Sequence, residues 1–546
     1  MMRNLLLAGA MLAGTTHAAW AVTCDEALTI AVEGVTLTDA SAQAAGDGLP
    51  AHCILHGEMG ARTGDDGQPY ALRFELRLPD TWDGRFMHQF NGGNDGEVKP
   101  ALGMWSNLPD GTGALARGMA VVSSDAGHDG AARPETGLVA GNAFGFDFEA
   151  RRMYGYGAVA MLNPAALELT TAYYGHAPDY SYGAGTSNGG RHAMVAAERM
   201  PGAFDGILAG YPGFNLPRAA LQHAWDVQSF RSAGPSLAKA FSPADMAVAA
   251  DKITQACDAL DGLEDGMVFD LKGCQAAFDP DSMTCTADMQ ENCLRPEQTA
   301  ALVRIHKGPH LADGTALYSD WAWDPGLASG GWRFWKLESP IPPWGKKPII
   351  AVMGAGSLAQ VFTTPPSDVD GTPEALENYL MNFDFEASAD AINATTAAFP
   401  ESAMQVMTPP HSDNPTLAEF QAEGGKLLIF HGQADPVFSI LDTIKWFDTL
   451  HSNTPEADEF TRLYTIPGMP HGAGGNAADE ADLLGALIDW VEQDKAPGAL
   501  TAHVRTANDE AASNMGASRP LCPYPSFAVY TGDNPAMADS FTCSDS

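Results

Sequence analysis

Positive charge is scarce in this sequence. Of its 546 residues, 30 are Lys or Arg and 68 are Asp or Glu, which gives a net charge of −38. A surface this acidic repels nucleic acids and anionic membranes, so neither is expected as a partner. The acidity itself is interpreted as a solvated surface and is given no catalytic role.

Several motifs of large enzyme classes are also missing. No group of Cys and His residues has the spacing of a zinc site. No glycine-rich run makes a convincing phosphate-binding loop or dinucleotide fingerprint, and there are no internal repeats. These absences argue against zinc chemistry and against nucleotide cofactors.

The N-terminus lacks a run long enough to span a membrane. The apolar run Leu5 to Gly14 is too short for a bilayer, follows a basic residue and precedes the small-residue cleavage site Ala19-Trp-Ala21. Residues 1–21 are therefore predicted to be a signal peptide, and the mature protein is expected in the periplasm or outside the cell. Cys24 follows a poor lipoprotein signal and is interpreted as a disulfide partner.

Cysteines are few but even in number. The eight cysteines fall into four sequence-adjacent pairs, which is typical of disulfides formed in an oxidising compartment. Eight cysteines allow many connectivities, and their positions alone do not choose among them.

The most informative segment that is present is the G-x-S-x-G motif Gly185-Thr-Ser187-Asn-Gly189. An extended aromatic segment, Tyr180-Ser-Tyr182, precedes it, and a helical pattern from Arg191 to Met200 follows it. On such a strand-to-helix turn a serine projects its hydroxyl from the sheet, and the next N–H, of Asn188, points to where an oxyanion forms. The motif predicts a nucleophile elbow at Ser187; the alternative is a glycine-rich turn with a helix-capping serine.

A nucleophilic serine needs a base and an orienting acid, which follow it in that fold in the order acid, then histidine. The buried-strand run Lys426 to Phe430 leads to Asp435, and the strand-like run Leu463 to Ile466 leads to His471 before a final helical pattern. Each position alone suits a turn, but all three in the required order indicate a triad of Ser187, Asp435 and His471.

The second half of an oxyanion hole is expected on a glycine-rich loop after an early strand. The run Arg85 to Phe90 is followed by the loop Asn91 to Gly96, in which Gly92 or Gly93 allows the backbone to approach a reacting carbonyl. The alternative is a plain hairpin turn.

The chain between Ser187 and Asp435 is far longer than one strand, one helix and their loops require. We predict core segments at residues 22–213 and 411–546, with an inserted lid at residues 214–410. A group of tryptophans in the lid indicates an aromatic-lined cleft or, individually, the lid's own core: Trp321, Trp323, Trp332, Trp335 and Trp344.

Several of these stretches together resemble the tannase and feruloyl esterase family of secreted α/β-hydrolases. The matching segments are Gly183 to Arg191, Gly424 to Pro436, Ile466 to Gly472, Trp490-Val-Glu with Ala496-Pro497, and Arg519 to Pro525. The resemblance implies an α/β-hydrolase fold and a serine carboxylic ester hydrolase for small esters of aromatic acids of the hydroxybenzoic or hydroxycinnamic type. The alternatives are a hydrolase of terephthalate monoesters or aliphatic polyester oligomers, a peptidase, and a catalytically silent binding protein.

The resemblance also bears on the cysteines. It implies sequential disulfides, namely Cys24–Cys53, Cys257–Cys274, Cys285–Cys293 and Cys522–Cys543. One departure is clear, because the family usually joins a Cys before the nucleophile to a Cys after the catalytic His. Here these positions are Thr186 and Gly472. The reaction class is expected to survive this change, whereas substrate subclass and triad rigidity are open.

An acidic loop in the predicted lid has the composition of a calcium site. Asp258, Asp261 and Asp265 lie close together on a glycine-punctuated segment, and Ca²⁺ prefers such oxygen ligands. The family resemblance favours a structural Ca²⁺, with carbonyls of Leu263 and Met267 completing the shell. The alternative is a solvated acidic loop.

Overall fold

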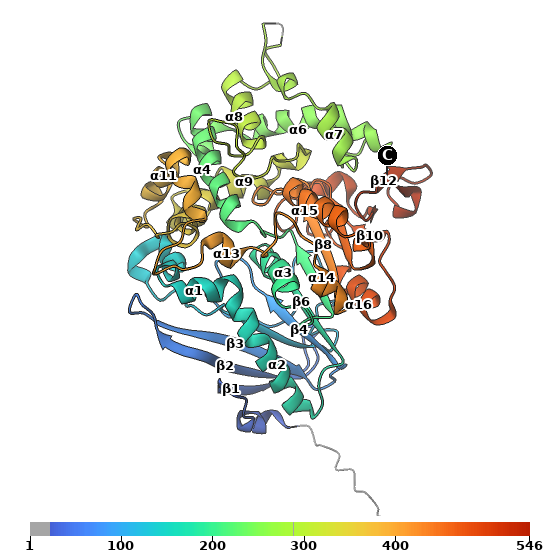
Figure 1. The fold of residues 1–546 in the computed structure, drawn as a ribbon. Helices are drawn as coiled ribbons and strands as arrows, with labels where there is room; N and C mark the ends of the chain where they lie inside the picture. Colours follow the sequence, from blue (N-terminus) through green and yellow to red (C-terminus); the bar gives the residue numbers. More distant parts are fainter. Residues whose placement is uncertain (1–21, 288, 546) are drawn as a thin grey trace, which may run out of the picture.

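The computed structural model describes residues 22–287 and 289–545 (Figure 1). The predicted signal peptide, residues 1–21, lies outside the described residues. Within the described part of the chain, no helix is long and apolar enough to cross a membrane.

A nine-stranded mixed sheet organises the molecule, in the order β1-β2-β3-β5-β4-β6-β7-β8-β9. The first three strands are antiparallel, and β3 pairs antiparallel with β5, whereas the strands from β5 to β9 are parallel. The strands are β1 (Val35–Gln43), β2 (His52–Thr63), β3 (Pro69–Pro79), β4 (Arg85–Phe90), β5 (Ala120–Ser124), β6 (Tyr180–Thr186), β7 (Gly206–Gly210), β8 (Lys426–Gly432) and β9 (Thr461–Ile466).

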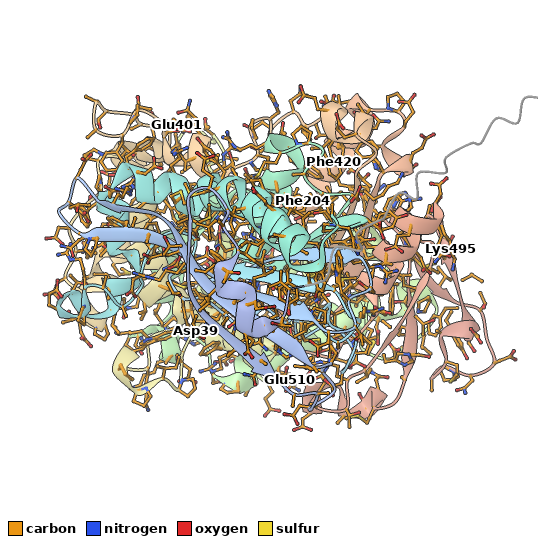
Figure 2. All side chains as sticks on the ribbon, turned by 90° about the horizontal axis from the view of Figure 1, so that it is seen from below. Asp39, Phe204, Glu401, Phe420, Lys495 and Glu510 are labelled. Carbon is orange, nitrogen blue, oxygen red and sulfur yellow. A yellow bond between two sulfur atoms is a disulfide. The ribbon has the colours of Figure 1, made fainter. Side chains whose placement is uncertain are left out.

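Helices cover both faces of the parallel part, which explains its nearly continuous apolar runs. Alternate residues of β7 enter different cores: Ile207 packs with α3 (Asn188–Arg199) and α15 (Ile440–Asn453), whereas Leu208 packs with α16 (Leu483–Gln493). Figure 2 shows Phe204 and Phe420 close together in the first of these cores. The arrangement is an α/β-hydrolase fold, as predicted.

The described residues between β7 and β8 add no strand to this sheet, although β7 and β8 are direct neighbours in it. Its helices gather beyond one end of the sheet in Figure 1. They include α4 (Leu216–Ala233), α6 (Pro243–Cys257), α7 (Leu271–Ala277), α8 (Pro296–His306), α9 (Gly330–Lys336) and α11 (Pro373–Met381). We call this inserted part the lid; its predicted limits, residues 214–410, stay a prediction.

Four disulfides join the cysteines in the sequential order that the family resemblance implied: Cys24–Cys53, Cys257–Cys274, Cys285–Cys293 and Cys522–Cys543. Two of them lie in the lid. The last one ties the C-terminal hairpin of β12 (Phe527–Tyr530) and β13 (Phe541–Ser544) to the strand β11 (Ser518–Leu521) that precedes it.

Candidate active site

The predicted nucleophile lies on a sharp turn between β6 and α3. Ser187 has φ +62° and ψ −123°, a conformation that costs free energy in a non-glycine residue and is concentrated at functional sites. The flanking glycines are required by close approach, because a Cβ at Gly185 or Gly189 would lie 2.6 or 2.3 Å from the carbonyl oxygen of Phe90. The helix starts at Asn188, three residues before the predicted start at Arg191.

The structure brings the three predicted triad residues together. His471 Nε2 lies 2.8 Å from Ser187 Oγ, and His471 Nδ1 lies 2.7 Å from Asp435 Oδ2. Asp435 follows β8 and His471 follows β9, so adjacent parallel strands deliver both side chains to the same edge as the nucleophile.

Asp435 is buried and held as an anion. Burial alone raises its pKa, but His471 and His431 more than offset this and hold the pKa of Asp435 below its usual range. The backbone N–H groups of Val437 and Phe438 donate to its other oxygen at 2.7 and 3.0 Å. His431 was missed by sequence reasoning, although its spacing of four residues from Asp435 was a usable signal.

Three aromatic rings surround the His471 imidazole. The ring centres of Tyr211, Trp335 and Phe438 lie 4.8, 4.9 and 5.4 Å from that of His471, with interplanar angles of 71°, 79° and 72°. These edge-to-face contacts restrict rotation of the imidazole. Tyr211 and Phe438 were not singled out by the sequence, and Tyr211 adopts φ +32° directly after β7.

Of the five lid tryptophans singled out in the sequence, Trp335 is the one with a ring contact to the predicted triad among the described residues. Trp321 and Trp332 are buried in the lid's own core, and Trp323 stacks on His306 with ring centres 3.5 Å apart. Trp344 packs at the edge of the same core. The lid therefore supplies one aromatic wall to the site and uses the other tryptophans for its own packing.

The glycine-rich loop after β4 passes beside the nucleophile. A Cβ at Gly92 would lie 3.9 Å from Ser187 Cβ, and Gly93 has φ +67°. The loop is tied to the elbow because Asn188 Nδ2 donates to Asp95 at 2.8 Å. The structure thus brings Gly92, Gly93 and Asn188 to the nucleophile, and their use as oxyanion donors stays a prediction.

Asp95 belongs to a buried polar network that the sequence did not reveal. Its carboxylate lies 3.0 Å from His192 Nε2, and Arg191 Nε donates to the side-chain oxygen Oδ1 of Asn188 at 2.7 Å. Burial raises the pKa of Asp95 to about 7, against the opposing charge of Arg191. The network fixes the first turn of α3 against the glycine-rich loop.

A cleft of about 290 Å³ opens beside this loop. Gly92 and Thr186, both close to Ser187, are among the residues that line it. The lining combines the apolar side chains of Leu102, Met104 and Trp105 with the polar side chains of Gln89, Asn91 and Lys99. Such a mixed lining suits an aromatic group that carries polar substituents.

The acidic lid loop lies outside the triad. The Asp258 carboxylate accepts the Gly266 N–H at 2.9 Å, that of Asp261 accepts the Phe269 N–H at 2.9 Å, and Asp265 pairs with Arg519. Among the described residues, no group of three or more His, Cys, Asp or Glu side chains is arranged to hold a metal. Calcium at this loop therefore stays a prediction.

Comparison with known proteins identifies the family. The sequence model "Tannase and feruloyl esterase" matches residues 55–544. The chain belongs to the tannase and feruloyl esterase family. Like other members of that family, it is a carboxylic ester hydrolase.

Individual relatives agree. The chain is 36% identical over 531 residues to mono(2-hydroxyethyl) terephthalate hydrolase of Piscinibacter sakaiensis, covering 92% of this chain and 86% of that protein. It is 30% identical to a probable feruloyl esterase of Arthroderma benhamiae, covering 86% and 81%. Feruloyl esterase B from Aspergillus oryzae shares the fold, with a TM-score of 0.75 at 21% identity over 95% of this chain and 99% of that one.

Proposed function

We propose that this family member is a serine hydrolase of small esters of aromatic acids and that Ser187, His471 and Asp435 form its catalytic triad. The observation that carries the proposal is the pair of contacts made by His471, 2.8 Å to Ser187 Oγ and 2.7 Å to Asp435 Oδ2. A base that touches both nucleophile and orienting acid meets the geometric requirement for activation of a serine.

The mechanism follows from this geometry. His471 Nε2 takes the Ser187 proton as Oγ attacks the ester carbonyl carbon, while Asp435 holds the Nδ1–H tautomer and stabilises the imidazolium. The N–H groups of Asn188 and of Gly93 or Gly92 receive the oxyanion. The bond to the alcohol then breaks, His471 protonates the leaving alcohol, and an acyl-enzyme remains. Water, deprotonated by His471, releases the acid and restores Ser187.

Aromatic substrates are supported by the surroundings of the triad. The rings of Trp335 and Phe438 stand at His471, and the neighbouring cleft of about 290 Å³ presents Leu102, Met104 and Trp105. Such apolar walls favour a flat acyl group over an aliphatic chain that gains less from ring contacts. Feruloyl esterases and a tannin acyl hydrolase are among the similar proteins.

A terephthalate monoester is the second candidate substrate. The relative from Piscinibacter sakaiensis, 36% identical, is named for that substrate. Lys99 lines the same cleft and pairs with the exposed Glu97, and a second carboxylate on the acyl ring would compete with Glu97 for this cation.

The deciding experiment compares kcat/KM for methyl ferulate, methyl gallate, mono(2-hydroxyethyl) terephthalate, hydroxybutyrate oligomers and a peptide amide. We expect the aryl esters to lead, and a preference for the terephthalate monoester would select the second candidate. Highest turnover of the aliphatic oligomers or of the peptide would refute an aromatic-acid esterase. Labelling of Ser187 by a fluorophosphonate, located by mass spectrometry, separates an enzyme from a silent binding protein.

We also propose a structural Ca²⁺ at the lid's acidic loop, held by Asp258, Asp261 and Asp265 with the carbonyls of Leu263 and Met267. The residues fit a cation in two respects. Asp258 and Asp261 are buried beside the charge of Asp265, and among the described residues no hydrogen bond reaches the carbonyl oxygen of Leu263 or Met267. The ion would neutralise the crowded carboxylates and stabilise the lid without taking part in the chemistry.

Calcium is tested by thermal melting. Chelation should lower the melting temperature, added Ca²⁺ should restore it, and Asp258→Asn with Asp261→Asn should remove this sensitivity. A melting curve indifferent to chelator and to Ca²⁺ would leave the loop as a purely hydrogen-bonded turn.

Packing is proposed to replace the family's disulfide beside the triad. Tyr211 lies between the two positions concerned, because its ring contacts His471 and its hydroxyl is near that of Thr186. Gly472 has φ +100°, which disfavours a Cys there. We expect the Thr186→Cys, Gly472→Cys variant to form its bridge under oxidising conditions at a cost in thermal stability. Two thiols that remain free would show that the turns are not juxtaposed as proposed.

Export by a signal peptide is likewise proposed, supported by the four disulfides. Expression of the full chain in a Gram-negative host should give a mature N-terminus at Val22 in the periplasm or medium, detectable by mass spectrometry of the intact protein.

A further inference from the structure

The lid places a buried ion pair behind the acid of the proposed triad. Lys336, the last residue of α9, donates from Nζ to Asp226 on α4, and the two side chains are 1% and 0% exposed. The Lys336 ammonium also lies 4.4 Å from the centre of the Trp321 ring. Burying an ammonium and a carboxylate costs much of what their attraction returns, so such a pair contributes little to stability for its own sake.

Lys336 faces the triad across a very small cavity. The cavity, about 10 Å³, is bounded on the lid side by Lys336 and on the core side by Gln433, Ala434 and Asp435. Burial lowers the pKa of Lys336, and the attraction of both Asp226 and Asp435 opposes that shift. Asp435 is therefore within electrostatic reach of the lysine, although the two do not form an ion pair.

The other ionisable lid groups around the Lys336–Asp226 pair do not place a positive charge beside Asp435. Burial lowers the pKa of His223 and of His306 to about 3, so both rings are neutral at neutral pH. Burial raises the pKa of Asp324, which lines the same cavity, to about 6. Burial raises the pKa of Asp226, and the positive charge of Arg304 opposes this shift together with that of Lys336. On the core side, His431 and His471 contact Asp435 directly.

We propose that Lys336, held in place by Asp226, is a positioning residue for the Ser187, His471 and Asp435 triad; the inference rests on the proposed function. A fixed cation behind Asp435 keeps this carboxylate ionised and aimed at His471 Nδ1. With the carboxylate fixed in this way, the imidazole stays oriented toward Ser187 Oγ. Lys336 touches no reacting atom and acts through Asp435.

The test separates charge from packing. Lys336→Met should lower kcat by about 10-fold with little change in KM, because Asp435 loses the group that fixes it and the imidazole loses its orientation. Lys336→Met with Asp226→Leu replaces the pair by apolar side chains and should regain the melting temperature lost in the single variant. We expect the double variant to keep the lowered kcat. A double variant with wild-type stability and wild-type kcat would make the pair purely structural and overturn the proposal.

Three further variants complete the design. Lys336→Arg retains the cation and should keep most of the wild-type kcat; a loss equal to that of Lys336→Met would overturn the proposal even if the double variant fails to fold. Lys347→Met breaks another lid ion pair, with Glu377, which lines a different cleft, and should leave kcat unchanged. An equal loss of kcat there would reduce the effect to general lid charge and would also overturn the proposal. Ser187→Ala should lack turnover; if it does not, the proposed function fails, and not this inference alone.

Discussion

The sheet core and the lid contribute to the site by different means. The core presents Ser187, Asp435 and His471 on turns at the ends of β6, β8 and β9, where backbone geometry decides each position. The lid presents side chains from helices and loops, with Trp335 at the His471 ring and Lys336 behind Asp435. The core therefore supplies the predicted triad and two of the three rings around His471, and the lid supplies the third ring and a cation behind Asp435.

The lid also contacts the backbone of the loop that carries His471. Asp324 accepts the N–H of Gly468, in the loop that carries His471, at 3.1 Å, and the N–H of Gly326 at 2.7 Å. A Cβ at Gly326 would lie 2.3 Å from the Gly468 carbonyl oxygen, so the two loops are in close contact. The lid thus shares a boundary with the catalytic loops themselves, and loosening it should disturb orientation before chemistry.

The largest expected effect is on the core side. Ser187→Ala should lower kcat by about 10⁴-fold or more with an unchanged melting temperature, because it removes the hydroxyl that we propose as the nucleophile. His471→Ala should behave alike, and the double variant should lose little more, since the two groups act as one unit. Steady-state kinetics with an activated aryl ester measure this. Near-normal turnover by Ser187→Ala would require another nucleophile.

On the lid side, Trp335→Ala should lower kcat/KM by about 10- to 100-fold, because the imidazole loses one of its three ring contacts and its orientation. Trp344→Ala is the matched control, as this tryptophan packs in the same lid without touching the triad. Equal losses in the two variants would mean that the lid acts only through its overall stability.

Removal of the lid disulfide Cys257–Cys274 by paired Ser substitutions should lower the free energy of unfolding by about 2–4 kcal/mol. Mild reduction should likewise act first on the lid and the termini, where the four disulfides lie. Activity and lid melting should then be lost together. Loss of activity before any change in the melting curve would place a redox-sensitive element at the triad itself.

The smallest expected effect is a pH dependence of stability at the contact between lid and core. Burial raises the pKa of Asp324 to about 6, so its stabilising contribution is complete below about pH 4 and is lost as the pH rises to 6. Asp324→Asn keeps an acceptor for Gly468 and should flatten this loss, by about 1–2 kcal/mol at pH 8. Chemical denaturation at pH 4 and pH 8 measures the difference. If Asp324→Asn loses as much unfolding free energy between pH 4 and pH 8 as the wild type does, Asp324 does not control this pH dependence.

Much of the core was predictable because its signals are local. Each of the three predicted triad residues follows a strand-like run in the sequence, and each run predicts a turn at its end. The helix start was placed three residues late because Gly189 and Gly190 are poor helix formers. They are there for close packing, since a Cβ at Gly190 would lie 2.5 Å from the Gly210 carbonyl oxygen.

The side chains that support the predicted triad were largely invisible in the sequence, both in the core and in the lid. Tyr211 and Asp95 of the core and Lys336 of the lid act through contacts with residues far away along the chain, and no spacing rule connects them to their partners. Trp335 was predicted only as one of five tryptophans. Side-chain contacts across an insertion depend on how two separately folded surfaces meet, which periodicity does not encode.

The adjacency of β7 and β8 has a consequence for folding. These strands are neighbours in the sheet, yet the whole lid lies between them in the chain, and β9 with His471 follows later still. Closing so long a loop is entropically costly, and contacts of high sequence separation slow folding. The triad is assembled only after nearly the entire chain is available. On the proposed triad, a chain that is still being synthesised holds Ser187 without its base and is inactive as an esterase until the last strands join the sheet.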